Sequence, residues 1–332
     1  INLSKFYPKV DTKYKYLNSG GFIGYKKDIL ELINTDINEL EDDQLYYTQQ
    51  FLEKENIKLD YKCEIFQTLN NSINDVALNI KKLELVNKYT KTTPSIIHGN
   101  GPSKLNLNII ANYIPNRWSE IYGYMIKNNK DEIKDNIKIA IYCNKLNKEN
   151  IKYKKDNIIY FTNEINYDED DNRRLYVLKS TDNEIENRLN VLEIIKNMKE
   201  VENITYVLFV DDDHILENID LEGLIKHDKE IIAPLLVRRN TYFSNFWGAI
   251  NNDGYYARSE DYFEIANYNR KGVWSVPYIQ NTYLFKIEII DEIINGYKFN
   301  ENMDLDMRLC KYLRDNNYLM YVDNLEYYGY IK

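Results

Sequence analysis

The 332-residue sequence has few of the residues that build metal clusters or disulfide frameworks. It contains three histidines and three cysteines, and Cys63, Cys143 and Cys310 lie far apart, without the spacing of a zinc site. We therefore expect three buried thiols, and the sequence leaves a disulfide open. No apolar run is long enough to span a membrane, and the first ten residues lack the pattern of a signal peptide. These absences predict a soluble protein whose compartment the sequence leaves open.

Blocks of basic residues are also absent. The chain carries 43 basic and 52 acidic residues, for a net charge of −9. A generic nucleic-acid partner needs a positive surface, so we expect none. An anionic ligand would have to be held by a local arrangement of groups. With 44% apolar residues, the chain is long enough for two globular domains with cores of their own.

The first part of the chain combines helical periodicity with a glycine-rich segment. Residues 17–25, LNSGGFIGY, form a strand-like run in which three glycines permit a turn or a close backbone approach. Helical spacing of apolar residues follows over 28–40. A second helix is expected from about Glu41, which places Asp42 and Asp43 in its first turn.

Strands alternate with helices after a linker expected at 128–136. NIKIAIYC and NIIYFT are strand candidates, an acidic loop occupies 168–171, and a helix is expected over about 183–200. ITYVLFV is apolar almost throughout, as in a strand buried on both faces of a parallel sheet. The fold class is therefore α/β. We expect a Rossmann-type domain over 1–130, its opening βαβ unit lying upstream, and a doubly wound domain over 131–332.

The stretch IIHGNGPSKL, residues 96–105, places an imidazole, a glycine-rich backbone and one amine within nine residues. The ring nitrogen of His98 can bind a divalent metal, glycines let amide groups face phosphates, and the ammonium of Lys104 adds a positive charge. Together these groups would neutralise the charge on a departing diphosphate. The alternative is a strand-end histidine with satisfied hydrogen bonds, followed by ordinary turn glycines.

Three polar residues nearer the start of the chain have two interpretations each. Asp42 and Asp43 can stabilise the helix start through capping and the helix dipole, or one of them can take the proton of an acceptor hydroxyl. Asn18 can hydrogen-bond a sugar hydroxyl or cap a turn. The sequence alone leaves these alternatives open.

A second acidic motif, DDDH at 211–214, follows the apolar strand at the edge where open α/β sheets place their ligands. A metal held by Asp211 and Asp213 would make the second half a transferase in its own right. The terminal segment NLEYYGYIK holds no histidine, so a counterpart of the His98 loop is missing there. We therefore expect no independent catalysis at this motif.

Several long motifs resemble a known family. YLNSGGFIGY, DDQLYYTQQF, CEIFQTLN and IIHGNGPSKLNLN are similar to the glycosyltransferase domain of the multifunctional procollagen lysyl hydroxylases and their viral homologues. IIAPLLVRR, GYYARSEDYFEI and DLDMRLCKYLRDNNYLMYVDN resemble the accessory domain that follows it. The resemblance extends from about residue 16 to residue 330. It implies a glycosyltransferase-A-like domain followed by an accessory domain of the same type.

The resemblance implies transfer of glucose from UDP-glucose to galactosyl-hydroxylysine of collagen-like chains, with Mn²⁺ as cofactor. It makes His98 a metal ligand beside two aspartates of an upstream DxxD motif. Contacts with the diphosphate fall on Gly101, Pro102, Ser103 and Lys104. Serine at 103 replaces the family's threonine and keeps the hydroxyl.

Site roles in the family also carry over to Asn18, Asp42 and Asp43. The family's poly-aspartate run is shortened here to EDD, which weakens an acceptor role that needs several carboxylates. The partners implied are a nucleotide-sugar donor, a collagen-like acceptor and, as an option, a second copy in a homodimer. The compartment implied is the lumen of the secretory pathway or, for a virus-encoded protein, the host cell.

Two alternative functions stay open. One is a non-catalytic accessory module that binds collagen or mediates dimerisation, and the other is a UDP-galactose-dependent hydroxylysine galactosyltransferase. A group of aromatic and charged residues would suit sugar or collagen binding, although such residues more often build a core edge: Trp247, Tyr255, Tyr256, Arg258, Asp261 and Trp274. The helix with Asp304, Asp306 and Arg308 is expected to present a solvated face with an ion pair.

Overall fold

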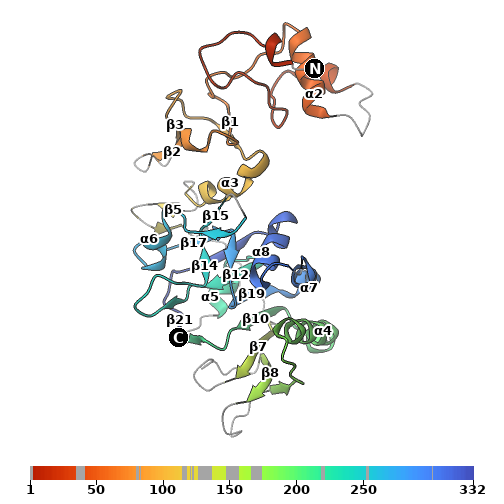
Figure 1. Cartoon of the computed structure of the whole chain (residues 1–332), viewed down its shortest axis with the longest axis vertical. Helices are drawn as coiled ribbons and strands as arrows, with labels where there is room; N and C mark the ends of the chain where they lie inside the picture. The colour runs from red at the N-terminus through yellow and green to blue at the C-terminus, as the bar shows by residue number, and fades with distance from the viewer. Residues whose placement is uncertain are drawn as a thin grey trace. The chain divides into compact units, whose positions relative to one another are not determined.

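The computed structural model describes residues 3–34, 42–79, 82, 84–113, 118–119, 121, 123–125, 137–146, 157–165, 174–217, 221–251, 254–300 and 302–332. They belong to two compact units, Ile1–Pro115 and Asn116–Lys332, called unit 1 and unit 2 below (Figure 1). The boundary predicted at residue 130, the linker over 128–136 and the acidic loop over 168–171 lie outside the described residues.

Unit 1 combines short helices with pairs of short strands. Its described helices are η1 (Leu3–Phe6), α1 (Lys26–Ile33), α2 (Asp43–Glu53), η2 (Ile73–Asp75), η3 (Gly101–Ser103) and α3 (Lys104–Ala111). Its described strands are β1 (Phe66–Thr68), β2 (Val76–Asn79), β3 (Glu84–Asn87) and β4 (Ile96–His98). The pair β1–β4 is parallel and the pair β2–β3 is antiparallel.

The helices predicted in unit 1 are confirmed where the structure describes them. Within the segment 28–40, α1 ends at Ile33, and residues 35–41 lie outside the described part. Helix α2 begins at Asp43 with Asp42 as its N-cap residue. The expectation of a strand over 17–25 is wrong. Two of its backbone groups bond to side chains, since Leu17 donates to the Tyr7 hydroxyl and Ser19 donates to Gln44.

Unit 2 is built around one large sheet. The strands of that sheet are β7 (Ile139–Leu146), β8 (Ile158–Ile165), β9 (Arg174–Val177), β10 (Tyr206–Val210), β12 (Ile231–Pro234), β17 (Val273–Val276), β19 (Tyr283–Lys286) and β20 (Met320–Asp323). The described helices are α4 (Glu184–Glu202), α5 (Leu221–Lys226), α6 (Tyr262–Ala266), η4 (Ile287–Ile289), α7 (Ile290–Lys298) and α8 (Leu305–Asp315).

Shorter strands surround the large sheet. They are β5 (Trp118–Ser119), β6 (Gly123–Tyr124), β11 (His214–Leu216), β13 (Val237–Arg238), β14 (Phe246–Trp247), β15 (Ala249–Ile250), β16 (Tyr256–Ala257), β18 (Tyr278–Ile279) and β21 (Gly329–Ile331). Strands β11, β21 and β13 form a sheet of three, while β5–β6, β14–β18 and β15–β16 are pairs.

The large sheet runs in the order β17-β20-β12-β19-β10-β7-β8-β9. Strand β10 pairs in parallel with β7, as its apolar sequence predicts, and β7, β8 and β9 continue the parallel run. Its other neighbour, β19, is antiparallel, so the sheet is mixed, with the predicted parallel pairing on one side of β10. Strand β10 is nevertheless buried on both faces, because burial depends on the helices that cover the sheet and not on the direction of the neighbouring strand.

Both faces of this sheet are covered by helices. On one face, Leu221, Leu224 and Ile225 of α5 join a core cluster with residues of β7, β8, β10, β12 and β19. On the other, the ring of Phe209 in β10 stacks on that of Tyr297 in α7. This arrangement confirms the predicted α/β class for unit 2. The cysteines are free and buried, as predicted.

The solvated face predicted around Asp306 is wrong. Its side chain is only 13% exposed and pairs with Arg188 of α4 at 3.5 Å. Arg308 is buried and donates to the carbonyls of Met303 and Tyr297. Asp304 caps α8 by accepting from the Met307 amide at 3.1 Å. Helix α8 therefore contacts α4 and α7 through polar side chains, and its Cys310 thiol donates to the carbonyl of Ile279 in β18.

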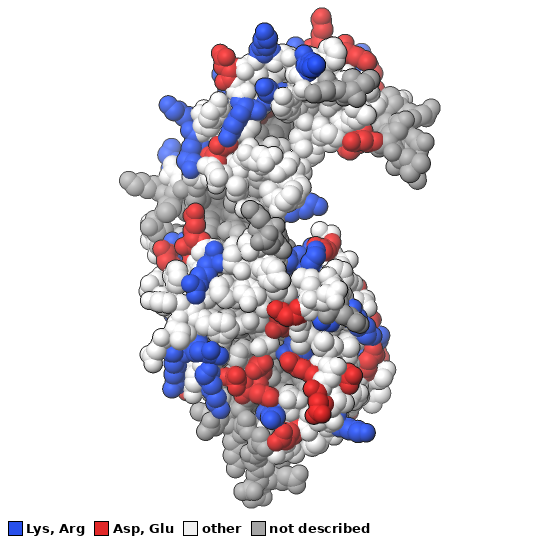
Figure 2. Space-filling view, viewed as in Figure 1, with Lys and Arg blue, Asp and Glu red and all other residues white. Residues whose placement is uncertain are grey.

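Acidic and basic side chains are interspersed over the described surface that Figure 2 shows, in keeping with the chain's modest net charge. Within the described residues, no helix combines the length and the apolar character needed to cross a membrane.

Candidate functional site

The two glycines that follow β4 are required for different reasons, Gly99 by close packing and Gly101 by its backbone conformation. A Cβ at Gly99 would lie 2.9 Å from Cβ of Leu107, so a side chain here would push α3 away from the end of β4. Gly101 has φ +55°, in the left-handed region that glycine adopts without cost. The local sequence therefore directs the chain straight from β4 into η3 and α3.

The loop between β4 and α3 is braced by its own polar groups. Ser103 is buried, its hydroxyl donates to the carbonyl of Asn100 at 2.7 Å, and its amide donates to the same oxygen. The side chain of Asn100 in turn accepts from the amide of Asn70 at 3.0 Å. Pro102 is exposed within η3. In this structure the Ser103 hydroxyl shapes the loop.

The N-terminus of α3 carries a lysine and lacks the acidic residues that are common at this position. Its first residue is the exposed Lys104, its first turn contains no acidic residue, and Ser103 at the N-cap makes no side-chain capping bond. Helix N-termini carry a partial positive charge that normally favours carboxylates. A lysine added to that charge, with exposed glycine backbone beside it, makes this end of α3 attractive to an anion such as a phosphate.

The His98 ring lies against Gly20, at the end of the loop of residues 17–20. A Cβ on Gly20 would lie 2.1 Å from Nε2 of His98 and less than 3 Å from Cε1 and Cδ2, so only a glycine fits here. His98 is half-buried at the end of β4, where its register partner in β1 is Thr68. The ring makes no hydrogen bond to another residue of the described part of unit 1.

A metal ion would find one ligand here among the described residues. Nowhere in the described ranges do three or more histidine, cysteine, aspartate or glutamate side chains gather as a metal site. His98 nevertheless fits the role of a single nitrogen ligand, because its ring is partly accessible and has no competing partner in the described residues.

Asn18 and Asp42 are both engaged in local hydrogen bonds. The side chain of Asn18 accepts from the amide of Gly20 at 3.1 Å, a turn of the kind that asparagine favours. Asp42 accepts from the amides of Gln44 and Leu45 at 3.0 and 3.3 Å, and both bonds use Oδ1. Asp43 is exposed in the first turn of α2. The structural alternatives for Asn18 and Asp42 are thus present, and neither prevents a second role.

The structure brings Asn18, Asp42 and His98 into one neighbourhood of unit 1 through Gln44 and Gly20. The Gln44 side chain bonds to the backbone of residues 17 and 19, and Gly20 contacts His98. Sequence reasoning missed Gln44. Its position directly after two aspartates in the first turn of a helix was the available signal.

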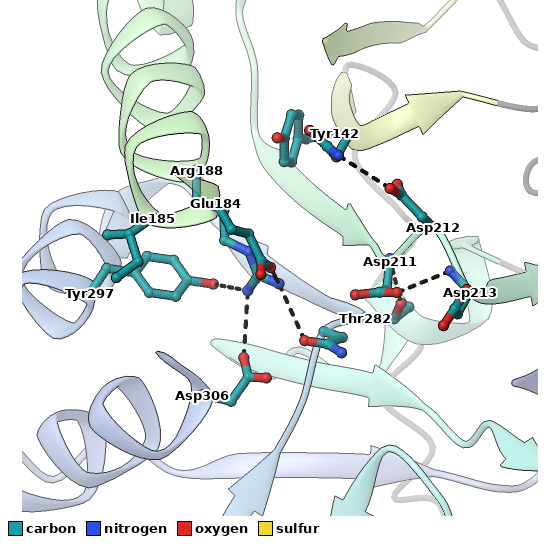
Figure 3. A network of polar contacts seen from close by, with 12 residues as sticks. Tyr142, Glu184, Ile185, Arg188, Asp211, Asp212, Asp213, Thr282, Tyr297 and Asp306 are labelled. Carbon is teal, nitrogen blue, oxygen red and sulfur yellow. Dashed lines mark hydrogen bonds and ion pairs between the residues drawn. The ribbon is translucent and has the colours of Figure 1, made fainter. Parts of the chain in front are cut away.

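In the acidic turn of unit 2, structural bonds engage both oxygens of the middle aspartate, Asp212. Asp212 accepts from the amide of Lys145 at 2.8 Å and from the side chain of Asn144 at 3.2 Å, and its burial raises its pKa. Asp211 accepts from the amide of Asp213 at 3.0 Å. Figure 3 shows the three aspartates around this turn beside Thr282. The turn fastens the end of β10 to the end of β7.

His214, the last residue of this motif, is buried and lies 2.7 Å from the Thr282 hydroxyl through Nδ1. Burial lowers its pKa to about 4, against the opposing effect of Asp211 and Asp213. The ring is therefore neutral at pH 7 and is enclosed in the core of unit 2.

A second residue that sequence reasoning missed is Arg188 of α4. Its guanidinium donates to the Tyr297 hydroxyl at 2.9 Å, to Glu184 at 2.6 Å and to Asn281 at 3.2 Å, and it pairs with Asp306 (Figure 3). Burial raises the pKa of Asp306 to about 6 and outweighs the opposing effect of Arg188. This buried network joins α4, α7 and α8 to the turn before β19.

The aromatic group of unit 2 forms a core edge, as expected. Trp274 is 1% exposed and donates to Asn324 at 2.9 Å. Trp247 packs on Tyr256 with ring centroids 4.9 Å apart, and the Arg258 guanidinium lies over the Trp247 ring. Tyr255 and Tyr256 lie at the surface of this group and are 58% and 37% exposed.

Comparison with known protein families defines the class of the chain. A family model described as PLOD GT domain matches residues 1–124. A second, described as glycosyltransferase family 25, N-terminal domain, matches residues 119–332. The chain is therefore composed of glycosyltransferase domains.

Individual relatives narrow this class. Human procollagen-lysine,2-oxoglutarate 5-dioxygenase 2 is 33% identical over 370 residues, covering 98% of this chain and 49% of the relative. The multifunctional procollagen lysine hydroxylase and glycosyltransferase of Caenorhabditis elegans is 32% identical, covering 99% and 50%. Uncharacterized protein R699 of Acanthamoeba polyphaga mimivirus is 32% identical over 346 residues, covering 99% and 73%.

The chain belongs to the procollagen lysyl hydroxylase and glycosyltransferase family, which confirms the resemblance seen in its motifs. It spans about half the length of the procollagen lysine hydroxylases that it matches.

Proposed function

We propose that this protein is a Mn²⁺-dependent glycosyltransferase that moves glucose from UDP-glucose to galactosyl-hydroxylysine of collagen-like chains. The observation that carries the proposal is the loop from His98 to Lys104. It combines a partly accessible imidazole, a left-handed glycine and a lysine at an uncapped helix start. These are the groups needed to neutralise a departing diphosphate.

In the proposed reaction, the acceptor hydroxyl oxygen forms a bond to C1 of glucose, and the bond from C1 to the phosphate oxygen breaks. UDP leaves with the electron pair. Mn²⁺, when bound, would neutralise charge on the diphosphate, and His98 would supply one of its ligands. The backbone at Gly101 and Pro102, the buried Ser103 that braces the loop, and the Lys104 ammonium would hold the diphosphate in place.

Asp42, Asp43 and Asn18 would act on the acceptor sugar. The capping bonds of Asp42 occupy Oδ1, which leaves Oδ2 to take the proton of the acceptor hydroxyl. Asp43 is exposed beside it and is the second candidate for that role. Asn18 keeps its side-chain amide group for a sugar hydroxyl, because its turn bond uses Oδ1.

The test measures UDP release from UDP-glucose in the intact protein with Mn²⁺ and a peptide that carries galactosyl-hydroxylysine. His98→Ala should lower both the rate and the affinity for Mn²⁺ measured by electron paramagnetic resonance. Lys104→Ala should raise the KM for UDP-glucose, whereas Lys58→Ala, another exposed lysine of unit 1, should not. Wild-type rate and Mn²⁺ affinity in His98→Ala would reject the ligand role. Preference for UDP-galactose with a hydroxylysine peptide would support the galactosyltransferase alternative.

A further inference from the structure

The side chain of Gln44 bonds to both residues that flank Asn18. Its Nε2 donates to the carbonyl of Leu17 at 2.8 Å, and its Oε1 accepts from the amide of Ser19 at 2.8 Å. A primary amide is the group that can do both at once, since it carries a donor and an acceptor side by side. The pair of bonds fixes the backbone on each side of Asn18.

The backbone of Gln44 is in turn bound by Asp42. The backbone amide of Gln44 donates to Oδ1 of Asp42 at 3.0 Å, within the capped first turn of α2. Gln44 is thus bonded to the start of α2 through its main chain and to the 17–19 loop through its side chain. Asn18 and Asp42 lie far apart in the sequence and acquire a fixed relation through this one residue.

The connection extends to the candidate metal ligand. Ser19, held by Gln44, is followed by Gly20, whose α-carbon packs against the His98 ring. A shift of the loop would therefore move Asn18 and the support of His98 together. Groups that act on one substrate must keep their mutual geometry, and an error of about 1 Å costs about 10²-fold in rate.

We infer that Gln44 is a positioning residue, which sets Asn18 and the Gly20–His98 contact relative to Asp42. The inference rests on the function proposed above and deepens it, because it identifies which residue holds the two halves of that site in register. Both polar ends of the Gln44 amide are engaged by backbone groups, so it acts through the loop residues that it holds in place, Asn18 and Gly20.

The informative change is Gln44→Glu, which keeps the size of the side chain and replaces the donor by an acceptor. The Leu17 carbonyl would then face a carboxylate oxygen, and the bond would become a repulsion. Gln49→Ala is the matched control, because Gln49 is an exposed glutamine of the same helix. Gln44→Ala, which removes both bonds without adding charge, is the second variant.

We expect Gln44→Glu and Gln44→Ala to lower kcat for UDP release about 10²-fold, with KM for UDP-glucose changed less than about threefold. Gln49→Ala should match the wild type. In an Asn18→Ala background, Gln44→Glu should have a smaller further effect than in the wild type, because the part transmitted through Asn18 is already lost and only the part transmitted through the Gly20–His98 contact is left. Thermal unfolding of each variant separates a folding defect from a loss of positioning.

Several results would overturn the inference. Additive effects of Gln44→Glu and Asn18→Ala would show that the two act independently, and a raised KM with unchanged kcat would show that Gln44 binds substrate. Wild-type kinetics in both Gln44 variants would reject the role outright. A wild-type protein that releases no UDP would instead refute the proposed function, so the two failures are distinguishable.

Discussion

Replacing Gly20 by alanine tests the contact that places His98. A Cβ at this position would lie 2.1 Å from Nε2 of His98, whereas ordinary contact begins at 3.4 Å. The ring or the loop would have to move by the difference, about 1.3 Å. Gly20 is exposed and its φ lies outside the left-handed region, so alanine adds no backbone strain of its own. The substitution therefore acts through the His98 ring.

The expected effect on activity is large and that on stability is small. Metal–ligand distances tolerate changes of only about 0.2 Å, and a misplacement of about 1 Å in an active site costs about 10²-fold in rate. We expect Gly20→Ala to lower UDP release by about two orders of magnitude and to weaken Mn²⁺ binding. Displacing a half-buried ring from its rotamer should reduce the free energy of unfolding by about 1 kcal/mol.

Two neighbouring glycines provide a graded control. A Cβ at Gly24 would lie 3.4 Å from Ile29, an ordinary contact, and one at Gly21 would lie 3.2 Å from the Phe66 ring. We therefore expect the largest loss of UDP release and Mn²⁺ binding in Gly20→Ala, a smaller loss in Gly21→Ala and the smallest in Gly24→Ala, because a shorter distance means a worse clash. Wild-type values in Gly20→Ala would refute the reasoning, and equal losses at all three positions would point to loop flexibility instead.

Two further predictions concern carboxylates. Asp42→Asn keeps the helix cap, so it should leave unfolding of unit 1 unchanged while reducing transfer, whereas Asp42→Ala should also destabilise the protein by about 1 kcal/mol. Thermal melts and UDP release check this, and full activity in Asp42→Asn would exclude a proton-accepting role. The raised pKa of Asp306, about 6, means that the folded state binds its proton more tightly than the unfolded state. Stability from this group therefore falls as pH rises from about 4 to about 6, by about 3 kcal/mol. The buried His214, whose pKa is lowered, has the opposite pH dependence, and it is present in both the wild type and Asp306→Asn. The measurement is therefore the difference between these two proteins in the free energy of unfolding by denaturant, across that pH range. A difference that does not change with pH would contradict the raised pKa of Asp306.

Elements set by local sequence were predictable. The start of α2 follows from an aspartate N-cap before a helical run, and β10 follows from five apolar residues in succession. The strand and the loop around His98 also follow from the chain, because the loop's conformation depends on glycines at 99 and 101. Helix α3, which follows the loop, was not predicted. These features need no knowledge of distant residues.

Features that depend on distant residues were not predictable. Periodicity in α4 indicated an apolar stripe through Ile185, Leu189, Leu192 and Ile195, and Leu192 and Ile195 are fully buried. The polar Asn187 and Arg188 are buried as well, whereas Ile185 and Leu189 are only partly so. The reason is the acidic and aromatic surroundings that α7 and α8 provide for Arg188. The same partner explains why Asp306, polar in sequence, lies against α4. A single helix cannot reveal a buried ion pair whose other half is more than a hundred residues away.

The contrast between the two acidic segments separates a candidate site from a structural turn. In unit 1, capping occupies one oxygen of Asp42 and leaves the other for chemistry. In unit 2, both oxygens of Asp212 accept hydrogen bonds that fasten β10 to β7, and the neighbouring histidine is buried against Thr282. Because groups already bonded in the fold must give up those bonds before they can hold a ligand, Asp212 and His214 are better suited to stabilising the sheet of unit 2. We accordingly propose unit 1 as the place of the transferase chemistry, because the capping bonds of Asp42 leave its Oδ2 unused and the side chains of Asp43 and Lys104 are exposed.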